Sequence, residues 1–298
     1  MIDVVILTYN QERWIDQAIN SVLNQRTTAI NRIIVADDAS KDRTADIVQN
    51  IADQHHGKIH LLAQKTNLGI NRNYFTAIQH CQSPWVAFLE GDDYWSDADK
   101  IALQLQSLSE NPTQIASVHP VQVVDELNQN LNEALPPCRF GGQKILDPYP
   151  ILSIYPPVFH TGSLVVKTEV IRQCDRTEFD FSPAKDMAIH YLLLQMGEIG
   201  VIPSSLGVYR LLQNSAFNSI SLLKKTAIEI LTHLRLHPLL HGELKAFHKQ
   251  RIALYFKYWA HISAEPSLTH QLPAAMEWII QTNDEEFIQS MIEPEYCN

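Results

Sequence analysis

The sequence predicts an α/β fold with a mostly parallel sheet flanked by helices, followed by a helical region at the C-terminal end. Two observations predict this class. Short apolar runs of strand length alternate with segments whose apolar residues recur at helical spacing, which is typical of repeated strand–helix units. Polar and acidic residues follow the strands directly, and open parallel sheets bind their ligands beyond these strand ends.

The first 125 residues or so contain the clearest strands and helices. The apolar runs that predict strands are 4–7, 33–36, 59–62 and 86–89. The apolar positions that predict the intervening helices lie at 15–23, 47–52 and 74–81.

The pattern weakens from about residue 126 to 160, where prolines punctuate a polar and aromatic stretch that predicts a long loop near the functional site. The α/β domain is expected to end near residue 215, after a strand, a helix and a strand at 163–166, 184–196 and 199–202. Residues 216–298 are expected to be helical, with helices around 222–234, 244–262 and 275–280.

Composition excludes several classes of protein. The 298 residues include 23 Lys and Arg against 33 Asp and Glu, a net charge of -10 that argues against nucleic-acid binding. The 10 glycines form neither of the common phosphate-cradling loops, so an anionic ligand would need help from a cation. The four cysteines are far apart, which argues against a zinc knuckle or disulfide framework and fits a reducing cytoplasm. With no signal peptide and no run of ~20 apolar residues, we expect a soluble protein, or one attached to a membrane from outside.

The strongest candidate site follows the run 86–89, where Glu90, Gly91, Asp92 and Asp93 stand together. Adjacent carboxylates at a strand end offer hard oxygen ligands for Mg2+ or Mn2+, and such a cation would neutralise a diphosphate. The alternative is structural, because two acids after a strand also cap a helix or lie solvated in a turn.

A second acidic pair, Asp37 and Asp38, follows the run 33–36. A carboxylate there can accept a hydrogen bond from a nucleotide base or a ribose hydroxyl. The alternative is helix capping by Ser40, Asp42 or Thr44, although Asp37 and Asp38 lie too close to the strand end to be needed for it.

Five segments, in this order and spacing, together resemble glycosyltransferase family 2 over roughly residues 1–215. They are 4–10 (VVILTYN), 21–25 (SVLNQ), 37–44 (DDASKDRT), 67–69 (NLG) and 89–93 (LEGDD). The resemblance implies a Rossmann-like GT-A fold, a nucleotide-diphosphate-sugar donor, a divalent cation and inversion at the anomeric carbon. It divides the domain into a nucleotide-binding half, about 1–125, and an acceptor half, about 126–215.

The resemblance also implies roles for individual residues. Asp93 is expected to contact Mn2+ or Mg2+ directly, and Asp92 to complete the acidic element and to face the ribose or sugar. Asp38, with Asp37 beside it, is expected to contact the base. The other residues expected to line the nucleotide-sugar pocket are Thr8, Tyr9, Asn10, Glu12, Asn67 and Arg72.

In the acceptor half, Asp186 matches an acid that family members have at the start of a helix, and the resemblance implies that it is the general base. An acceptor hydroxyl needs a carboxylate to take its proton while the anomeric carbon is attacked opposite the leaving diphosphate. The structural alternative is a helix-start charge worth ~0.3–1 kcal/mol. His160 and Thr161 fall where relatives shape the sugar pocket, and the alternative for them is a buried polar turn.

One position departs from the family pattern. Members often have a Tyr-Arg-x-His segment after the last strand, but here Tyr209 and Arg210 are followed by Leu211 and Leu212, so the histidine is missing. Either a nearby residue such as Gln213 or Asn214 replaces it, or metal binds more weakly, or activity is lost. The Q-x-x-R-W signature of processive synthases is also absent, which favours transfer of a single sugar.

The sequence therefore predicts an inverting, metal-dependent glycosyltransferase that moves one sugar, with a UDP-sugar favoured, to a saccharide or lipid-linked acceptor. We expect it in the cytoplasm, with peripheral association at the inner face of the membrane left open along with its oligomeric state. The alternative is a non-catalytic nucleotide-sugar-binding protein on the same scaffold. A sugar nucleotidyltransferase would need a glycine-rich loop where residues 8–11 read TYNQ.

Overall fold

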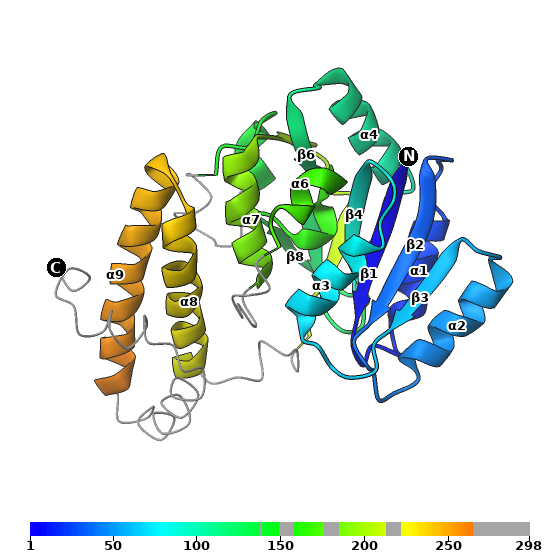
Figure 1. Cartoon of the computed structure of the whole chain (residues 1–298), viewed down its shortest axis with the longest axis horizontal. Coiled ribbons are helices and arrows are strands. Elements are labelled where there is room, and N and C mark those ends of the chain that lie inside the picture. The colour runs from blue at the N-terminus through cyan, green and yellow to red at the C-terminus, as the bar shows by residue number, and fades with distance from the viewer. Residues whose placement is uncertain (138, 149–157, 176–184, 213–221, 265–298) are drawn as a thin grey trace. The chain divides into compact units, whose positions relative to one another are not determined.

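The computed structural model describes residues 1–137, 139–148, 158–175, 185–212 and 222–264 (Figure 1). The chain divides into two compact units. Unit 1 comprises Met1–Thr177 and Met196–Leu211, and unit 2 comprises Glu178–Gln195 and Leu212–Asn298. The helix predicted around 275–280 lies outside the described residues, as does part of the proline-rich stretch, at 149–157.

Unit 1 is built on a seven-stranded sheet with the order β10-β6-β9-β4-β1-β2-β3. Among the described strands of this sheet, β9 alone runs antiparallel to its neighbours, so the predicted mostly parallel sheet is confirmed. The strands are β1 (Ile2–Thr8), β2 (Ile30–Asp37), β3 (Ile59–Ala63), β4 (Trp85–Glu90), β6 (Gln114–Val118), β9 (Val165–Lys167) and β10 (Glu198–Val201).

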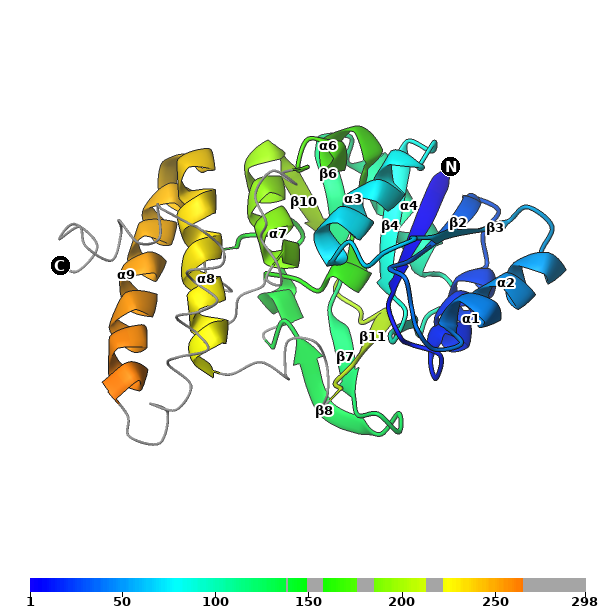
Figure 2. The ribbon, with the colours of Figure 1, turned by 60° about the horizontal axis from the view of Figure 1, so that its bottom comes forward.

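Helices cover both faces of this sheet (Figure 2). Because crossovers between parallel strands are right-handed, the steps from β1 to β2 and from β2 to β3 put their helices on one face, and the return to β4 puts its helix on the other. Figure 2 shows α1 and α2 together on one side of the sheet and α3 near α6 on the opposite side. The helices of unit 1 are α1 (Ile15–Leu23), α2 (Thr44–Gln54), α3 (Ile70–Gln79), α4 (Lys100–Glu110) and α6 (Thr168–Arg172).

The core lies between the sheet and these helices. All seven residues of β1 are buried, as expected for a strand covered on both faces. Ile15 and Ile19 of α1 pack into the same fully buried cluster as Val4 and Ile6 of β1, so the helical spacing of the apolar residues is explained by one face of α1 lying on the sheet.

A second, four-stranded sheet in unit 1 has the order β5-β11-β7-β8. It contains β5 (Tyr94–Trp95), β7 (Val121–Val124), β8 (Asn130–Leu135) and β11 (Gly207–Arg210). The prediction of a loop throughout 126–160 is therefore wrong at β8. The first four residues of β8 are exposed and β8 is an edge strand, so its sequence shows no buried apolar alternation. In the same stretch the structure has the 3₁₀ turn η1 (Arg139–Gly142), and the turn η2 (Thr161–Ser163) follows it.

Unit 2 is helical in the part that the structure describes. It contains α7 (Lys185–Met196) up to Gln195, α8 (Leu222–Leu236), the 3₁₀ turn η3 (His237–Leu239) and α9 (Gly242–Ala264). The buried Nδ1 atoms of His233 on α8 and His248 on α9 lie 2.9 Å apart. None of the helices described has both the length and the apolar character needed to cross a bilayer.

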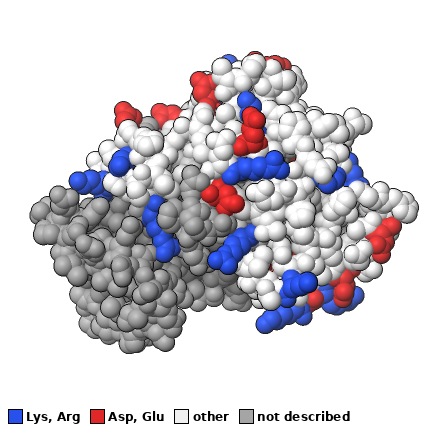
Figure 3. Space-filling view, viewed as in Figure 1, with Lys and Arg blue, Asp and Glu red and all other residues white. Residues whose placement is uncertain are grey.

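Charged side chains of both signs are scattered over the face of the molecule in Figure 3. The described residues on that face form no continuous basic surface, in keeping with the acidic composition of the chain. This distribution gives no support to nucleic-acid binding there.

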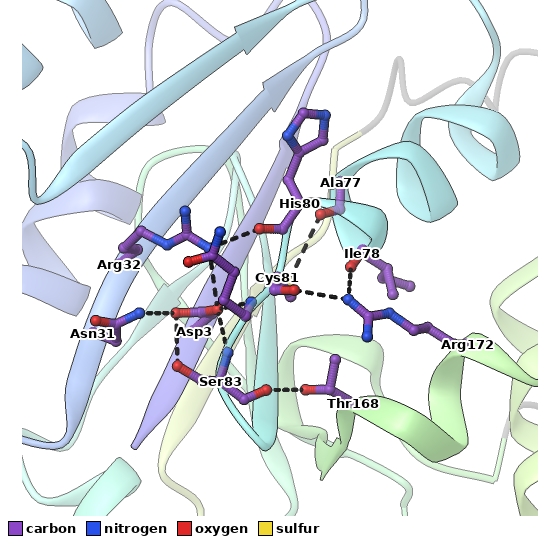
Figure 4. A network of polar contacts seen from close by, with 11 residues as sticks. Asp3, Asn31, Arg32, Ala77, Ile78, His80, Cys81, Ser83, Thr168 and Arg172 are labelled. Carbon is purple, nitrogen blue, oxygen red and sulfur yellow. Dashed lines mark hydrogen bonds and ion pairs between the residues drawn. The ribbon is translucent and has the colours of Figure 1, made fainter.

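A buried carboxylate fixes the amino end of β1 (Figure 4). Asp3 is fully buried and accepts hydrogen bonds from the N–H groups of Gln82 (2.6 Å) and Ser83 (2.8 Å), the Ser83 hydroxyl (2.9 Å) and the Asn31 amide (2.9 Å). The Thr168 hydroxyl donates to the Ser83 carbonyl at 2.7 Å and so extends the network to α6. Burial by itself raises the pKa of Asp3, but the hydrogen bonds outweigh it and hold the pKa below its ordinary value.

We expect Asp3→Asn to lower the free energy of unfolding of unit 1 by about 3 kcal/mol at pH 7, because an amide group cannot accept all four hydrogen bonds. Asp53→Asn, at an exposed position on α2, is the control and should cost less than about 0.5 kcal/mol. Urea unfolding measured against pH checks both.

The pH dependence has a definite sign. Because the pKa of Asp3 is lower in the folded protein, the carboxylate contributes its full stability above the unfolded pKa of about 3.9 and loses it as the pH falls through the folded pKa. The difference between wild type and Asp3→Asn should therefore shrink at acid pH. A difference that stays constant down to the acid transition would contradict this role.

Candidate active site

The carboxyl ends of β1, β2 and β4 meet at one edge of the main sheet because these strands are parallel and aligned. Thr8 pairs with Asp37 across β1 and β2, and Leu7 pairs with Glu90 across β1 and β4. The polar segments that follow the three strands are therefore neighbours in space. In open parallel sheets this edge is where ligands bind.

Hydrogen bonds join the segment after β1 to the segment after β2. The Asn10 side chain accepts from the Lys41 N–H group at 2.7 Å, and the Glu12 carboxylate accepts from the Arg43 N–H group at 3.0 Å. The Asn10 N–H group donates to the Ser40 hydroxyl at 2.8 Å, and Asn10 adopts a positive φ of 53° that asparagine tolerates. Asn10 and Glu12 thus each use a side-chain oxygen to shape this loop.

Asp37 and Asp38 are both buried but have different partners. The two Asp37 oxygens accept from the N–H group of Ser40, at 3.0 Å, and from its hydroxyl. One Asp38 oxygen accepts from the Leu68 N–H group at 2.7 Å, and the Asn67 amide donates to the Asp38 carbonyl at 3.2 Å. Asp37 therefore holds its own turn, whereas Asp38 and Asn67 hold the loop after β3 against this edge of the sheet.

Asp42 lies in the turn before α2. Its Oδ1 accepts from the Thr44 N–H group at 2.9 Å and from the Thr44 hydroxyl at 2.6 Å. The N-cap residue of α2 is Arg43, and no side chain caps the helix, so Asp42 holds the turn before it and neither Asp37 nor Asp38 is a cap.

Gly91 allows the turn after β4 to lie close to the segment after β1. A Cβ atom at Gly91 would lie 2.5 Å from Gln11 Oε1 and 2.8 Å from Thr8 Oγ1, so a side chain does not fit. Both of these oxygens are buried and lack a hydrogen-bond partner among the residues described. The acidic turn is therefore bordered by polar atoms that a bound ligand can satisfy.

Arg210, at the end of β11, holds the acidic turn in place. It is 1% exposed, its Nε donates to the Asp92 carbonyl at 2.8 Å, and its backbone N–H group donates to Asp93 Oδ1 at 2.8 Å. Its Nη2 donates to Gln17 at 2.9 Å, and the guanidinium lies 5.8 Å from the centre of the Tyr94 ring. Sequence reasoning did not single out Arg210 as a site residue, although its place in the Tyr-Arg pair was a signal.

The electrostatics of the turn favour a cation. Burial raises the pKa of Asp93 well above its ordinary value, and the nearby carboxylates of Asp92 and Glu90 raise it further. Burial raises the pKa of Asp92 to about 6, against the opposing charge of Arg210. Burial lowers the pKa of His160 to about 4, so the imidazole is neutral at pH 7. A positive ion beside these carboxylates would reverse the unfavourable interactions.

The turn η2 brings His160 to the acidic residues. His160 Nε2 lies 3.6 Å from Glu90 Oε2 and 3.6 Å from Asp93 Oδ2, and the three ligand atoms all lie within 4.8 Å of one another. Thr161, next in the chain, is buried. This group of possible metal ligands contains two carboxylates, which belong to Glu90 and Asp93. Asp92, the other acid expected at the metal, is not in the group.

Other predicted residues lie apart from this group or beyond what the structure describes. Tyr9 is 42% exposed at the end of β1, and Arg72 is exposed in the first turn of α3. Asp186 belongs to the first turn of α7 in unit 2, but its side chain lies outside the described residues, as do Gln213 and Asn214. The roles predicted for these residues remain predictions.

Comparison with known sequences identifies the class of protein. The family model for glycosyl transferase family 2 matches residues 3–158. An uncharacterized protein of Mycobacterium tuberculosis is 29% identical over 211 residues, covering 70% of this chain and 58% of that protein. The Escherichia coli UDP-Glc:alpha-D-GlcNAc-diphosphoundecaprenol beta-1,3-glucosyltransferase WfgD is 32% identical over 111 residues, 37% of this chain and 42% of that protein. The chain thus spans less than two thirds of the length of these relatives.

Solved structures share the fold. Staphylococcus aureus TarS 1-349 in complex with UDP-GlcNAc has a TM-score of 0.66 at 16% identity, covering 96% of this chain and 82% of that chain. The mannosyltransferase PcManGT from Pyrobaculum calidifontis, in complex with GDP-Man and Mn2+, has a TM-score of 0.58 at 17% identity. The match covers 99% of this chain and 84% of that chain. The shared architecture with these structures is the GT-A fold. The chain belongs to glycosyl transferase family 2, as its motifs predicted.

We expect Arg210→Lys to lower the free energy of unfolding by about 2–4 kcal/mol, because lysine keeps the charge but cannot make the three side-chain hydrogen bonds. Hydrogen exchange should quicken at the backbone amides of 91–94. Arg26→Lys, which alters an exposed pair with Asp99, is the control and should change stability by less than about 0.5 kcal/mol. Unchanged exchange in 91–94 would contradict the role given to Arg210.

Proposed function

We propose that this chain is an inverting, divalent-metal-dependent glycosyltransferase that moves one sugar from a nucleotide-diphosphate sugar to a hydroxyl of a saccharide or lipid-linked acceptor. The observation that carries the proposal is the buried Asp93 carboxylate at the end of β4, in a domain of glycosyl transferase family 2. Its Oδ2 accepts no hydrogen bond from the residues described. A carboxylate in this state favours a bound cation, and a cation at this strand end would meet the diphosphate of a donor.

The nucleotide is proposed to bind along the edge formed by β1, β2 and β4. Asp38 is proposed to accept from the base, and its contacts with Asn67 and Leu68 support this by fixing its position. The exposed Tyr9 ring and the unpartnered Thr8 hydroxyl, both at the end of β1, offer an aromatic surface and a polar contact to the ligand. We favour a UDP-sugar because TarS is solved with UDP-GlcNAc and the E. coli relative is named for UDP-Glc.

The metal's proposed contribution is charge neutralisation of the leaving diphosphate, which lowers the barrier to its departure. The residues present suit this ion, since two carboxylates and an imidazole are ligands that Mn2+ accepts. Arg210 keeps Asp93 in position through its backbone N–H group and leaves Oδ2 directed to the cluster. PcManGT was solved with Mn2+, which adds support for a divalent cation.

The proton of the acceptor hydroxyl is proposed to go to Asp186. A single displacement forms the bond from the acceptor oxygen to the anomeric carbon, breaks the bond from that carbon to the diphosphate oxygen, and inverts the configuration. A carboxylate within hydrogen-bond reach takes the proton as the new bond forms. Asp186 is the candidate because it stands in the first turn of α7, as the family resemblance led us to expect.

The proposed setting is the cytoplasm, at the inner face of the membrane if the acceptor is lipid-linked. Cys81 and Cys174 are buried and form no disulfide with the residues described, which fits a reducing compartment. The E. coli relative is named for a diphosphoundecaprenol-linked acceptor, which supports an acceptor of this type and a part in making cell-surface polysaccharide.

The first test is nucleotide binding. We expect UDP to bind at least tenfold more tightly with Mn2+ than without it, and Asp93→Ala to abolish this difference, because the cation links the carboxylate to the diphosphate. Isothermal titration calorimetry with UDP and with GDP measures it. Asp46→Ala, at an exposed acid on α2, is the matched control. No nucleotide binding with any divalent metal would refute the proposal.

The second test is transfer. We expect Asp186→Asn to leave UDP binding unchanged and to slow sugar transfer about 10²–10⁴-fold, because the amide cannot take a proton. Glu243→Gln, an exposed acid in the first turn of α9, is the matched control. The missing histidine at Leu212 favours a second candidate, a non-catalytic nucleotide-sugar-binding protein. Donor binding without transfer or hydrolysis across a broad acceptor panel would favour that candidate.

A further inference from the structure

We propose that the divalent cation is held by Glu90, Asp93 and His160, and that His160 supplies the nitrogen ligand that Leu212 cannot. This inference rests on the proposed function and names the residues that hold its metal ion. Glu90 and Asp93 lie at the end of β4, and His160 comes immediately before η2. The fold brings these separate parts of unit 1 together, so their meeting is not visible in any local sequence motif.

The distances suit one shared ion. Metal bonds to nitrogen and oxygen are about 2.0–2.2 Å long, which puts neighbouring ligands of one ion about 3.0 Å apart in octahedral geometry and opposite ligands about 4.2 Å apart. His160 Nε2 is 3.6 Å from each of the two carboxylate oxygens, and no pair in the group exceeds 4.8 Å. Shifts of a few tenths of an ångström, on the order of ordinary side-chain adjustment, would complete the geometry.

Asp93 provides an independent indication of a ligand. Its side chain is 2% exposed, and Oδ1 accepts from the Arg210 backbone N–H group at 2.8 Å. Oδ2 is buried without a hydrogen-bond partner in the part of the chain described, and it is the oxygen nearest His160. Without an ion, a proton shared with the neighbouring Glu90 carboxyl group satisfies this oxygen, and that hydrogen bond adds to the raised pKa of Asp93. A cation bound between the two groups would replace the proton.

The His160 side chain is held toward the acidic pair. The Gly162 N–H group donates to His160 Nδ1 at 3.1 Å, and the Ser163 hydroxyl donates to the His160 carbonyl at 2.6 Å. Trp95 Nε1 donates to the Gly162 carbonyl at 3.1 Å, and the buried Gln104 amide donates to the Ser163 carbonyl at 2.9 Å. The contacts of the Ser163, Trp95 and Gln104 side chains fix the turn that carries His160, and they do not depend on which ring nitrogen holds the proton.

The proton on the imidazole distinguishes the metal-bound ring from the free ring. Because Nδ1 accepts from Gly162, the neutral free ring carries its proton on Nε2. Metal binding at Nε2 would put the ring proton on Nδ1, where it would face the Gly162 N–H group, so this hydrogen bond would be lost and the two donors would have to turn apart. If no ion binds, the same Nε2–H group would simply bridge Glu90 and Asp93, and His160 would be a structural residue.

Asp92 is not one of the three proposed metal ligands. Its carbonyl accepts from Arg210 Nε, and its side chain hydrogen-bonds Gln11 rather than joining the three ligands. The contact of Asp92 with the donor sugar stays a prediction.

The test is Mn2+ binding to the full chain, with and without UDP, followed by calorimetry and by electron spin-echo spectroscopy of the bound ion. We expect nitrogen modulation from one directly bound imidazole in the wild type. We expect His160→Gln to remove this modulation and to weaken Mn2+ binding about tenfold or more. Glu90→Gln should weaken binding similarly, whereas Asp92→Asn should change it less than about threefold. His80→Gln, an exposed histidine after α3, is the matched control.

The outcomes separate this inference from the function on which it rests. Mn2+ bound without nitrogen modulation, or modulation unchanged in His160→Gln, would overturn the assignment of His160 while leaving metal-dependent UDP binding intact. Failure of Mn2+ to bind even with UDP would overturn both. Circular dichroism of His160→Gln should match that of the wild type. If that variant does not fold, His160→Asn provides the same spectroscopic test, and retained modulation there would also overturn the inference.

Discussion

The acidic turn after β4 depends on one constraint: a carboxylate buried at a strand end must be held in place and offset by positive charge. Asp93 is 2% exposed, and burial together with its acidic neighbours makes its charged form costly. The Arg210 backbone N–H group donates to Asp93 Oδ1 and so stabilises the charged form in part. The Arg210 side chain donates to the Asp92 carbonyl and keeps the turn in place. What Arg210 leaves unsatisfied is Oδ2, and the proposed cation completes the site.

The main sheet of unit 1 explains why that carboxylate lies at the edge where ligands bind. Parallel strands in register bring the ends of β1, β2 and β4 to one edge, where Thr8 pairs with Asp37 and Leu7 with Glu90. The buried Asp3 network fixes the opposite end of β1. The strands fix the positions of the turns that follow them, and these turns carry Asp38, Asp92 and Asp93, which is the usual arrangement in α/β folds.

Much of this could be predicted from the sequence because buried strands and amphipathic helices leave periodic patterns. The strand ends with Asp37, Asp38, Asp92 and Asp93 could be identified for the same reason. The edge strand β8 could not, since its exposed residues carry no alternation. The proximity of His160 to Glu90 could not be predicted from the sequence, and neither could the role of Arg210, because both depend on tertiary contacts between distant segments. The division of the chain near residue 215 and the role of Asp186 stay predictions.

The most direct measurement is a crystal structure of the full chain with UDP and Mn2+, with anomalous diffraction recorded at the manganese edge. We predict one strong anomalous peak about 2.2 Å from His160 Nε2 and from oxygens of Glu90 and Asp93, with the UDP diphosphate on its open side. A peak held by Asp92 and Asp93 without His160 would contradict the proposed ligand set. The absence of any peak in this cluster while UDP is bound would contradict the claim that a cation completes the site.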